Sequence, residues 1–114
     1  MPFINAKVTL SIDDNKKEFI QSKLTDFVAD SLTKPKKFIM VNIEDNQQIW
    51  FAGEKLKNGA FVSVRLMGNV SKAAYSNLTK KICDFFESEL NIHSENIYVT
   101  FHPVEFWGWN GSIL

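Results

Sequence analysis

Apolar and polar residues alternate over residues 3–10, at the start of the chain. The apolar positions of this segment are Ile4, Ala6, Val8 and Leu10. A period of two residues is typical of a strand with one buried face, so we predict a strand here. The apolar residues then change to a helical spacing of three and four, at positions 20, 24, 27, 28 and 32. Asp13 and Asp14 favour a helix start before this stretch, and Pro35 favours its end. Branched residues over 38–43 predict a second strand.

The same succession of patterns returns at an offset of 58 residues, which carries Ile4 onto Val62 and Ile39 onto Ile97. The second copy predicts, in order, a strand over about 60–67, a helix over about 72–90 and a strand over about 97–102. Ser71 is suited to cap that helix. Between the copies, the sequence predicts an extra short strand over 48–51. We therefore expect one domain, 1–114, with pseudo-repeats over about 2–45 and 60–103.

Two copies of strand–helix–strand predict an α+β fold of duplicated β-α-β units, the split βαβ arrangement. In this fold a four-stranded mixed sheet carries both helices on one face and leaves the other face uncovered. Residues expected on the uncovered face include Met40, Phe61, Met67 and Tyr98. These side chains are too apolar for a face that meets only water. We therefore expect the face to bind a ligand or, preferably, another subunit.

Composition narrows the classes of function without identifying one. The 114 residues fit one domain, and 45% hydrophobic residues suffice for a packed core. The 13 basic and 13 acidic residues cancel, whereas proteins that bind phosphate backbones usually carry a basic excess. The single cysteine, Cys83, excludes an internal disulfide, a CxxC redox pair and a cysteine-based zinc site. His93 and His102 are too isolated to predict a metal site, and no cofactor is expected. No stretch is apolar enough to predict a membrane span.

A four-stranded sheet with one open face also describes RNA-recognition modules, whose third strand carries aromatic residues that stack on bases. The third predicted strand matches that signature at Lys57, Ala60, Phe61 and Val62. Gly59 and Val64, however, occupy two of the positions where stacking aromatics are required. Because the net charge is also zero, we expect no nucleic-acid partner.

Pro2 directly follows Met1, and a small second residue normally permits removal of the initiator methionine. The freed proline would carry a secondary α-amine. An α-amino group has a pKa near 7.7–8.0, and burial in an apolar pocket lowers it further. Such a base can remove a proton from a carbon next to a carbonyl group. Proline is common at this position, so the residue alone does not establish a catalytic role.

Five short motifs appear in order along the chain. They are Met1-Pro2-Phe3-Ile4, Thr33-Lys34-Pro35 followed by Phe38-Ile39-Met40-Val41, Leu66-Met67-Gly68, Ile97-Tyr98-Val99, and Trp107-Gly108-Trp109-Asn110-Gly111-Ser112. In their order and spacing the chain resembles the macrophage migration inhibitory factor family of the tautomerase superfamily, over essentially its whole length. The resemblance implies a homotrimer whose sheets enclose a central channel, with active sites at the subunit boundaries. It also implies keto–enol tautomerisation of phenylpyruvate and p-hydroxyphenylpyruvate, with conversion of dopachrome analogues as a side activity.

The resemblance assigns roles to eight residues of this chain. Pro2 matches the catalytic proline, whose amine moves a proton between oxygen and carbon of the substrate. Lys34 matches the lysine that contacts the substrate's carboxylate or carbonyl oxygen, and Met67 the position whose backbone N–H binds the substrate. Tyr98 matches an aromatic residue that reaches the site from a neighbouring subunit. Thr100 matches a position where many members have an asparagine that contacts the phenolic end of the substrate. The last three of the eight residues form a wall of the pocket against the substrate's aromatic ring: Trp107, Trp109 and Leu114.

Without the resemblance, Lys34 would belong to a solvated lysine run and Tyr98 to ordinary sheet packing. Two features depart from the family pattern. Several animal members carry a CxxC pair linked to redox activity, and the matching positions here are Gly59 and Val62, so we expect that activity to be absent. The hydroxyl of Thr100 is shorter than an asparagine amide, which weakens the expected preference for hydroxyphenylpyruvate over phenylpyruvate.

The alternative function is that of a signalling protein. Animal members of the family act as cytokines through cell-surface receptors, which would make a receptor a further partner and the tautomerase pocket secondary. The N-terminal residues lack the basic and long apolar regions of a secretory signal. We expect a cytoplasmic protein, and secretion by a non-classical route stays open, because family members leave cells without such a signal.

Overall fold

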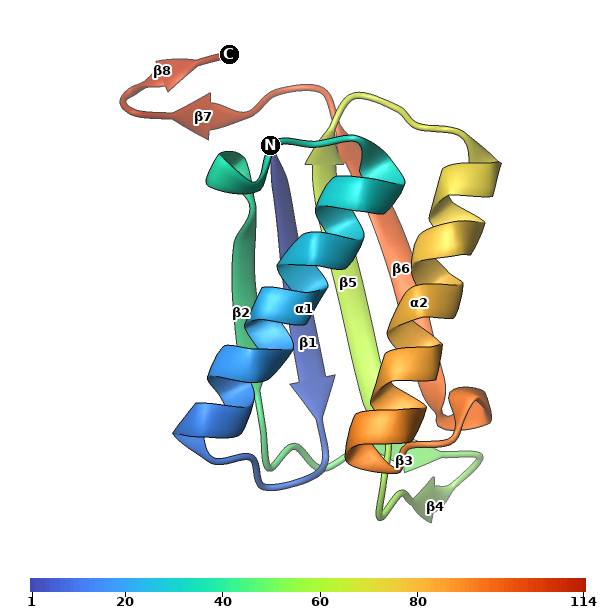
Figure 1. Ribbon diagram of the computed structural model, residues 1–114. Coiled ribbons are helices and arrows are strands. Elements are labelled where there is room, and N and C mark those ends of the chain that lie inside the picture. The colour runs from blue at the N-terminus through green and yellow to red at the C-terminus, as the bar shows by residue number, and fades with distance from the viewer.

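The computed structural model describes residues 1–114 and has two layers, a sheet and a pair of helices that cover one of its faces (Figure 1). The sheet has four strands in the order β2-β1-β5-β6. They span Pro2–Val8 (β1), Met40–Glu44 (β2), Ala60–Met67 (β5) and Ile97–Val104 (β6). The central pair β1–β5 is antiparallel, and the outer pairs β1–β2 and β5–β6 are parallel. This mixed sheet confirms the predicted α+β fold with duplicated β-α-β units.

The helices α1 (Asp14–Leu32) and α2 (Lys72–Leu90) each connect two parallel strands. Both begin with a side-chain cap. The Asp13 carboxylate and the Ser71 hydroxyl each accept a hydrogen bond from the backbone N–H three residues ahead, which satisfies one of the free N–H groups of the first turn. The predicted bounds of the second helix, 72–90, are therefore confirmed together with its cap.

The first helix ends at Leu32, earlier than the prediction from Pro35. Thr33 adopts a left-handed conformation with φ of 54°, which turns the chain out of the helix before the proline is reached. A 3₁₀ turn, η1 (Lys36–Phe38), then delays β2 until Met40, so the predicted strand start at 38 was too early. The end of α1 therefore becomes a short loop at one end of the sheet.

The core lies between the sheet and the helices and contains 19 buried apolar residues. Alternate residues of the two central strands point into it: Ile4, Ala6, Val8, Val62, Val64 and Leu66. The helices supply Ile20, Leu24, Val28, Leu78, Ile82 and Phe86, all nearly inaccessible to water. The apolar residues that alternate along the strands thus face the apolar residues that recur every three or four positions along the helices. Burial of the surface between them stabilises the fold.

The open face of the sheet is apolar at its ends and polar in its middle. Of the four apolar residues expected there, Met40, Phe61 and Tyr98 are 67%, 38% and 58% exposed, and Met67 is half-buried. Between them lie polar side chains, those of Asn5, Asn42, Ser63, Arg65, Thr100 and His102. The four apolar residues predicted for the open face therefore lie on it, at its two ends, and the centre of the face is polar.

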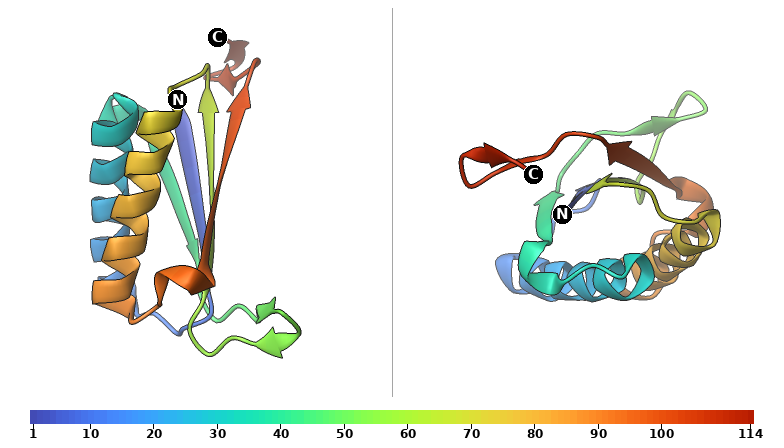
Figure 2. Two further views of the ribbon diagram at one scale, coloured as in Figure 1. Left: turned by 90° about the vertical axis from the view of Figure 1, so that its right-hand side faces the viewer. Right: turned by 90° about the horizontal axis from the view of Figure 1, so that it is seen from above.

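Two short hairpins extend beyond the sheet. The strands β3 (Trp50–Phe51) and β4 (Glu54–Lys55) pair only with each other and project from the open-face side (Figure 2). The short strand predicted over 48–51 is thus present as β3, outside the main sheet. The strands β7 (Gly108–Trp109) and β8 (Ser112–Ile113) form the second hairpin, at the opposite end of the sheet and near the N-terminus (Figure 1). A further 3₁₀ turn, η2 (Ser94–Asn96), leads into β6.

Candidate active site

Pro2 is the first residue of β1 and is buried at the end of the sheet where β5 finishes. Its register partner on β5 is Leu66, so the start of the chain lies beside the Met67–Gly68 turn. Met1 precedes Pro2, which makes the Pro2 nitrogen an amide and removes its basicity. Only loss of Met1 creates the secondary amine that acid–base chemistry would require.

Lys34 lies in the loop after α1 and points toward the same end of β5. Its Nζ donates a hydrogen bond to the Met67 carbonyl oxygen at 3.5 Å. The pKa of the Met1 α-amino group is lowered from its ordinary value of 8.0, first by burial and second by the positive charge of Lys34. The structure therefore gathers Pro2, Lys34 and Met67 around the N-terminus, as expected from the sequence.

A cavity of about 410 Å³ adjoins this group at the ends of β5 and β6. It is lined by Met67, Gly68, Asn69, Pro103, Val104 and Glu105. Gly68 adopts a φ of 81°, a conformation that costs a glycine nothing and strains other residues. This turn lets the chain leave β5 sharply and keeps the space beside Met67 open.

The C-terminal hairpin forms an aromatic wall at the same end. The ring of Trp109 packs edge-on against Phe38, with ring centroids 5.5 Å apart and an interplanar angle of 83°. The backbone N–H of Leu114 donates to the Trp107 carbonyl at 3.0 Å, which ties the end of the chain to the start of the hairpin. Three of the predicted wall residues thus belong to one hairpin that packs on η1.

Phe38 is a residue of this wall that the sequence prediction did not assign to the site. Its ring lies against Trp109, and the Nζ of Lys37 is 5.1 Å from its ring centroid. The residue belongs to one of the motifs that carry the family resemblance, which is the signal that could have identified it. In the sequence pattern alone it appears as the first residue of a strand.

Tyr98 and Thr100 do not join the other predicted residues within one chain. Tyr98 pairs in register with Phe61, five residues along β5 from the Leu66 partner of Pro2, a separation of about 16 Å. The Tyr98 ring instead lies 5.4 Å from Phe51 of the β3–β4 hairpin. Thr100 lies between these ends on the open face, whereas Pro2 is on the buried face.

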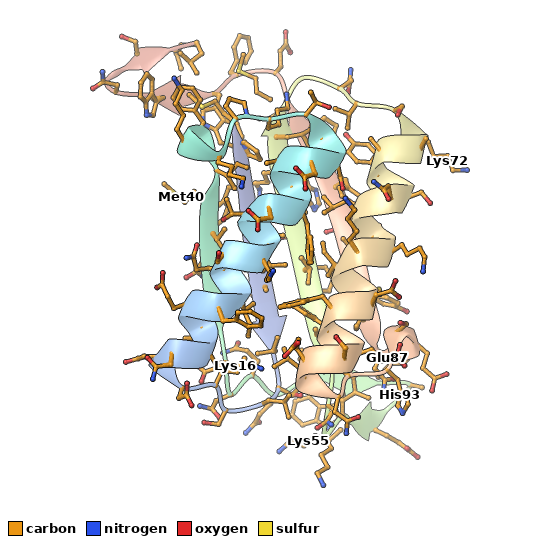
Figure 3. All side chains as sticks on the ribbon, viewed as in Figure 1. Lys16, Met40, Lys55, Lys72, Glu87 and His93 are labelled. Carbon is orange, nitrogen blue, oxygen red and sulfur yellow. The ribbon has the colours of Figure 1, made fainter.

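The other chemistry-bearing residues lie apart from this site. His93 is beside Glu87, with Nδ1 3.4 Å from a carboxylate oxygen, at the opposite end of the molecule (Figure 3). Cys83 is half-buried, and burial raises the pKa of its thiol, which disfavours the reactive thiolate. No group of three or more His, Cys, Asp or Glu side chains is arranged to hold a metal ion.

Comparison with known proteins decides the family. The sequence model described as "Macrophage migration inhibitory factor (MIF)" matches residues 1–114. The chain belongs to the MIF family. The MIF of Xenopus tropicalis is 28% identical over 101 residues, which cover 87% of each chain. The MIF-like protein mif-2 of Caenorhabditis elegans is 29% identical over 122 aligned positions, with 100% of this chain and 95% of the relative covered.

Solved MIF structures have the same fold. The crystal structure of Leishmania major MIF2 superposes with a TM-score of 0.92 at 29% identity and covers 100% of this chain and 97% of its own. The MIF homologue from Prochlorococcus marinus gives a TM-score of 0.87 at 26% identity, with 97% of both chains covered. The chain is thus a MIF-like protein of the tautomerase superfamily. Neither helix is long and apolar enough to cross a membrane.

Proposed function

We propose that the protein is a keto–enol tautomerase of phenylpyruvate-type α-keto acids, in which the Pro2 amine acts as general acid and base after loss of Met1. The observation that carries the proposal is the environment of the N-terminus. Burial and the charge of Lys34 both lower the pKa of an α-amino group there. A lowered pKa keeps a larger fraction of an amine unprotonated near neutral pH, which is the state that accepts a proton.

In the direction from keto to enol, the Pro2 nitrogen takes a proton from the carbon next to the C2 carbonyl group. The electron pair of that C–H bond forms the C2=C3 double bond, and the carbonyl oxygen gains a proton to become the enol hydroxyl. The reverse direction returns a proton from the Pro2 ammonium to carbon. No net oxidation occurs, and no cofactor is required.

Lys34 has two tasks in this proposal. Its ammonium pairs with the substrate's carboxylate or carbonyl oxygen, and its charge disfavours protonation of the nearby amine. The hydrogen bond to the Met67 carbonyl occupies one of its three N–H groups and leaves two for a ligand. The Met67 backbone and the wall of Trp107, Trp109 and Leu114 would then hold the rest of the substrate, with its aromatic ring against the wall.

Tyr98 and Thr100 take part in this proposal only as residues of a neighbouring subunit in a homotrimer. The register partners of Pro2 and Tyr98 on β5, Leu66 and Phe61, are about 16 Å apart along the strand. This separation is too large for one chain to present both residues to a small substrate. Tyr98 is 58% exposed in the single chain, which leaves it free to meet another copy. A small α-keto acid would therefore lie at a boundary between subunits.

The test is the loss of phenylpyruvate enol absorbance, measured with protein whose intact mass proves that Met1 is absent. We expect fast decay with the processed protein and a loss of most of that rate in Pro2→Gly, because glycine offers a primary amine with different basicity and shape. Protein that retains Met1 should be inactive, because its Pro2 nitrogen is an amide.

Circular dichroism and native mass spectrometry of Pro2→Gly serve as the control for folding and assembly. Undiminished activity in a folded Pro2→Gly variant, or in protein that retains Met1, would contradict the role of Pro2. Inactivity of correctly processed protein would refute the tautomerase proposal and favour the signalling function.

A further inference from the structure

Two side chains on the open face of β6 form a hydrogen bond that none of the assigned roles explains. Thr100 Oγ1 and His102 Nε2 lie 2.8 Å apart, well within hydrogen-bond distance. The two residues alternate along the strand, so both project from the same face of the sheet. Their register partners on β5 are Ser63 and Arg65, which present a hydroxyl and a guanidinium beside them.

The bond fixes a group that would otherwise rotate. A threonine hydroxyl alone can donate in several directions and accept through two lone pairs. With His102 as its partner, the hydroxyl uses one of its hydrogen bonds along the strand and keeps its other hydrogen-bonding capacity for a ligand. Because β6 is the edge strand, only β5 flanks this pair within the chain, and the outward direction is open.

We infer that His102 is a positioning residue that orients the Thr100 hydroxyl, so that the pair recognises a hydrogen-bonding substituent at the far end of an aromatic α-keto acid. The inference rests on the proposed function, in which Thr100 of a neighbouring subunit meets that end of the substrate. An aligned hydroxyl has lost its rotational freedom before binding, which reduces the cost of a new bond. The pair would therefore favour p-hydroxyphenylpyruvate over phenylpyruvate despite the short reach of Thr100.

The experiment compares the two substrates in a set of variants at Thr100 and His102. His102→Leu removes the bond at similar size, His102→Gln retains a group that can donate or accept at about the position of Nε2, and Thr100→Val removes the hydroxyl. The readout is the ratio of kcat/KM for p-hydroxyphenylpyruvate to that for phenylpyruvate. A ratio cancels differences in the amount of folded protein. His93→Leu is the matched control, because it makes the same substitution at an exposed histidine outside the sheet, between α2 and η2.

We expect the ratio to fall about three- to tenfold in His102→Leu, the effect of one hydrogen bond, mainly through KM of the hydroxylated substrate. His102→Gln should restore most of the ratio, and His93→Leu should not change it. The double variant Thr100→Val, His102→Leu should be no worse than Thr100→Val alone, because His102 acts only through that hydroxyl.

Three results would overturn the inference. They are an unchanged ratio in His102→Leu, a loss in His102→Gln as large as in His102→Leu, and losses that simply add in the double variant. Failure of the proposed function has a different signature, because the wild-type protein would then convert neither substrate, and the inference would fall with it.

Discussion

Replacing Lys34 by methionine tests the electrostatic part of the proposed site. Methionine keeps most of the length of the side chain and removes its charge. In the structure the ammonium makes one hydrogen bond to protein, to the Met67 carbonyl at 3.5 Å, and that neutral oxygen does not cancel its charge. A carboxylate substrate would therefore meet an ammonium with two free N–H groups.

The size of the effect follows from this arrangement. A hydrogen bond between charged groups is worth about 1.5–3 kcal/mol, and about 1.4 kcal/mol corresponds to a factor of ten in binding. We expect Lys34→Met to raise KM for phenylpyruvate about 10- to 100-fold. Lys72→Met is the control, because Lys72 is exposed at the start of α2, on the opposite side of the view from Met40 of β2 (Figure 3).

The same variant should also change the pH dependence of the reaction. Lys34 is the second cause, after burial, of the lowered pKa at the N-terminus, so its removal should raise the pKa of the Pro2 amine. The amine is active when unprotonated, and the acid limb of kcat/KM against pH should therefore move to higher pH. Burial remains in the variant, so the pKa should stay below that of an exposed amine. Equal KM values in the two lysine variants, or an acid limb that does not move, would refute the reasoning.

Two further predictions concern the stability of the fold. Asp45 accepts a hydrogen bond from the Ile12 backbone N–H at 2.9 Å and pairs with Lys17 at 3.1 Å, and these contacts lower the pKa of its carboxyl below 3.8. A carboxyl whose pKa is lowered by folding adds stability above its unfolded pKa and loses it as the pH falls through the folded value. Asp45→Asn should therefore lower the Tm at pH 7, and the difference from wild type should vanish in acid; a difference independent of pH would contradict this assignment. Thr33→Gly should stabilise the protein by about 1 kcal/mol in urea unfolding, because φ of 54° strains a branched residue, and a destabilised variant would show that the strain is absent.

Local patterns predicted the elements whose boundaries are set by their own residues. The second helix has its cap at Ser71, its apolar face repeats at helical spacing, and its bounds agree with the structure. The start of β2 could not be found in this way. Phe38, the last residue of the turn at Lys36–Phe38, packs against Trp109, a residue about seventy positions later, and no local pattern records that contact.

The candidate site shows the same division between local and distant information. Lys34 meets the Met67 carbonyl because the end of α1 and the end of β5 lie at the same end of the sheet. The spacing of the two residues along the sequence does not reveal this contact. The family resemblance supplied the pair, and the fold explains it. The bond between Thr100 and His102 is the reverse case, because alternation along a strand brings these two side chains to one face.

The arrangement of β6 gives a physical reason for the subunit boundary in the proposal. Pro2 faces the helices and lies near the end of β5, whereas Tyr98 and Thr100 project from the other face of the sheet toward its opposite end. No side-chain rotation moves a residue from one face of a strand to the other, since the pleat fixes its direction. If these residues act on one substrate, a second copy must bring its own open face to the first copy's N-terminus. Assembly would then be a condition of substrate binding at this site, and the distal part of the substrate would be recognised by residues that a single chain cannot place beside Pro2.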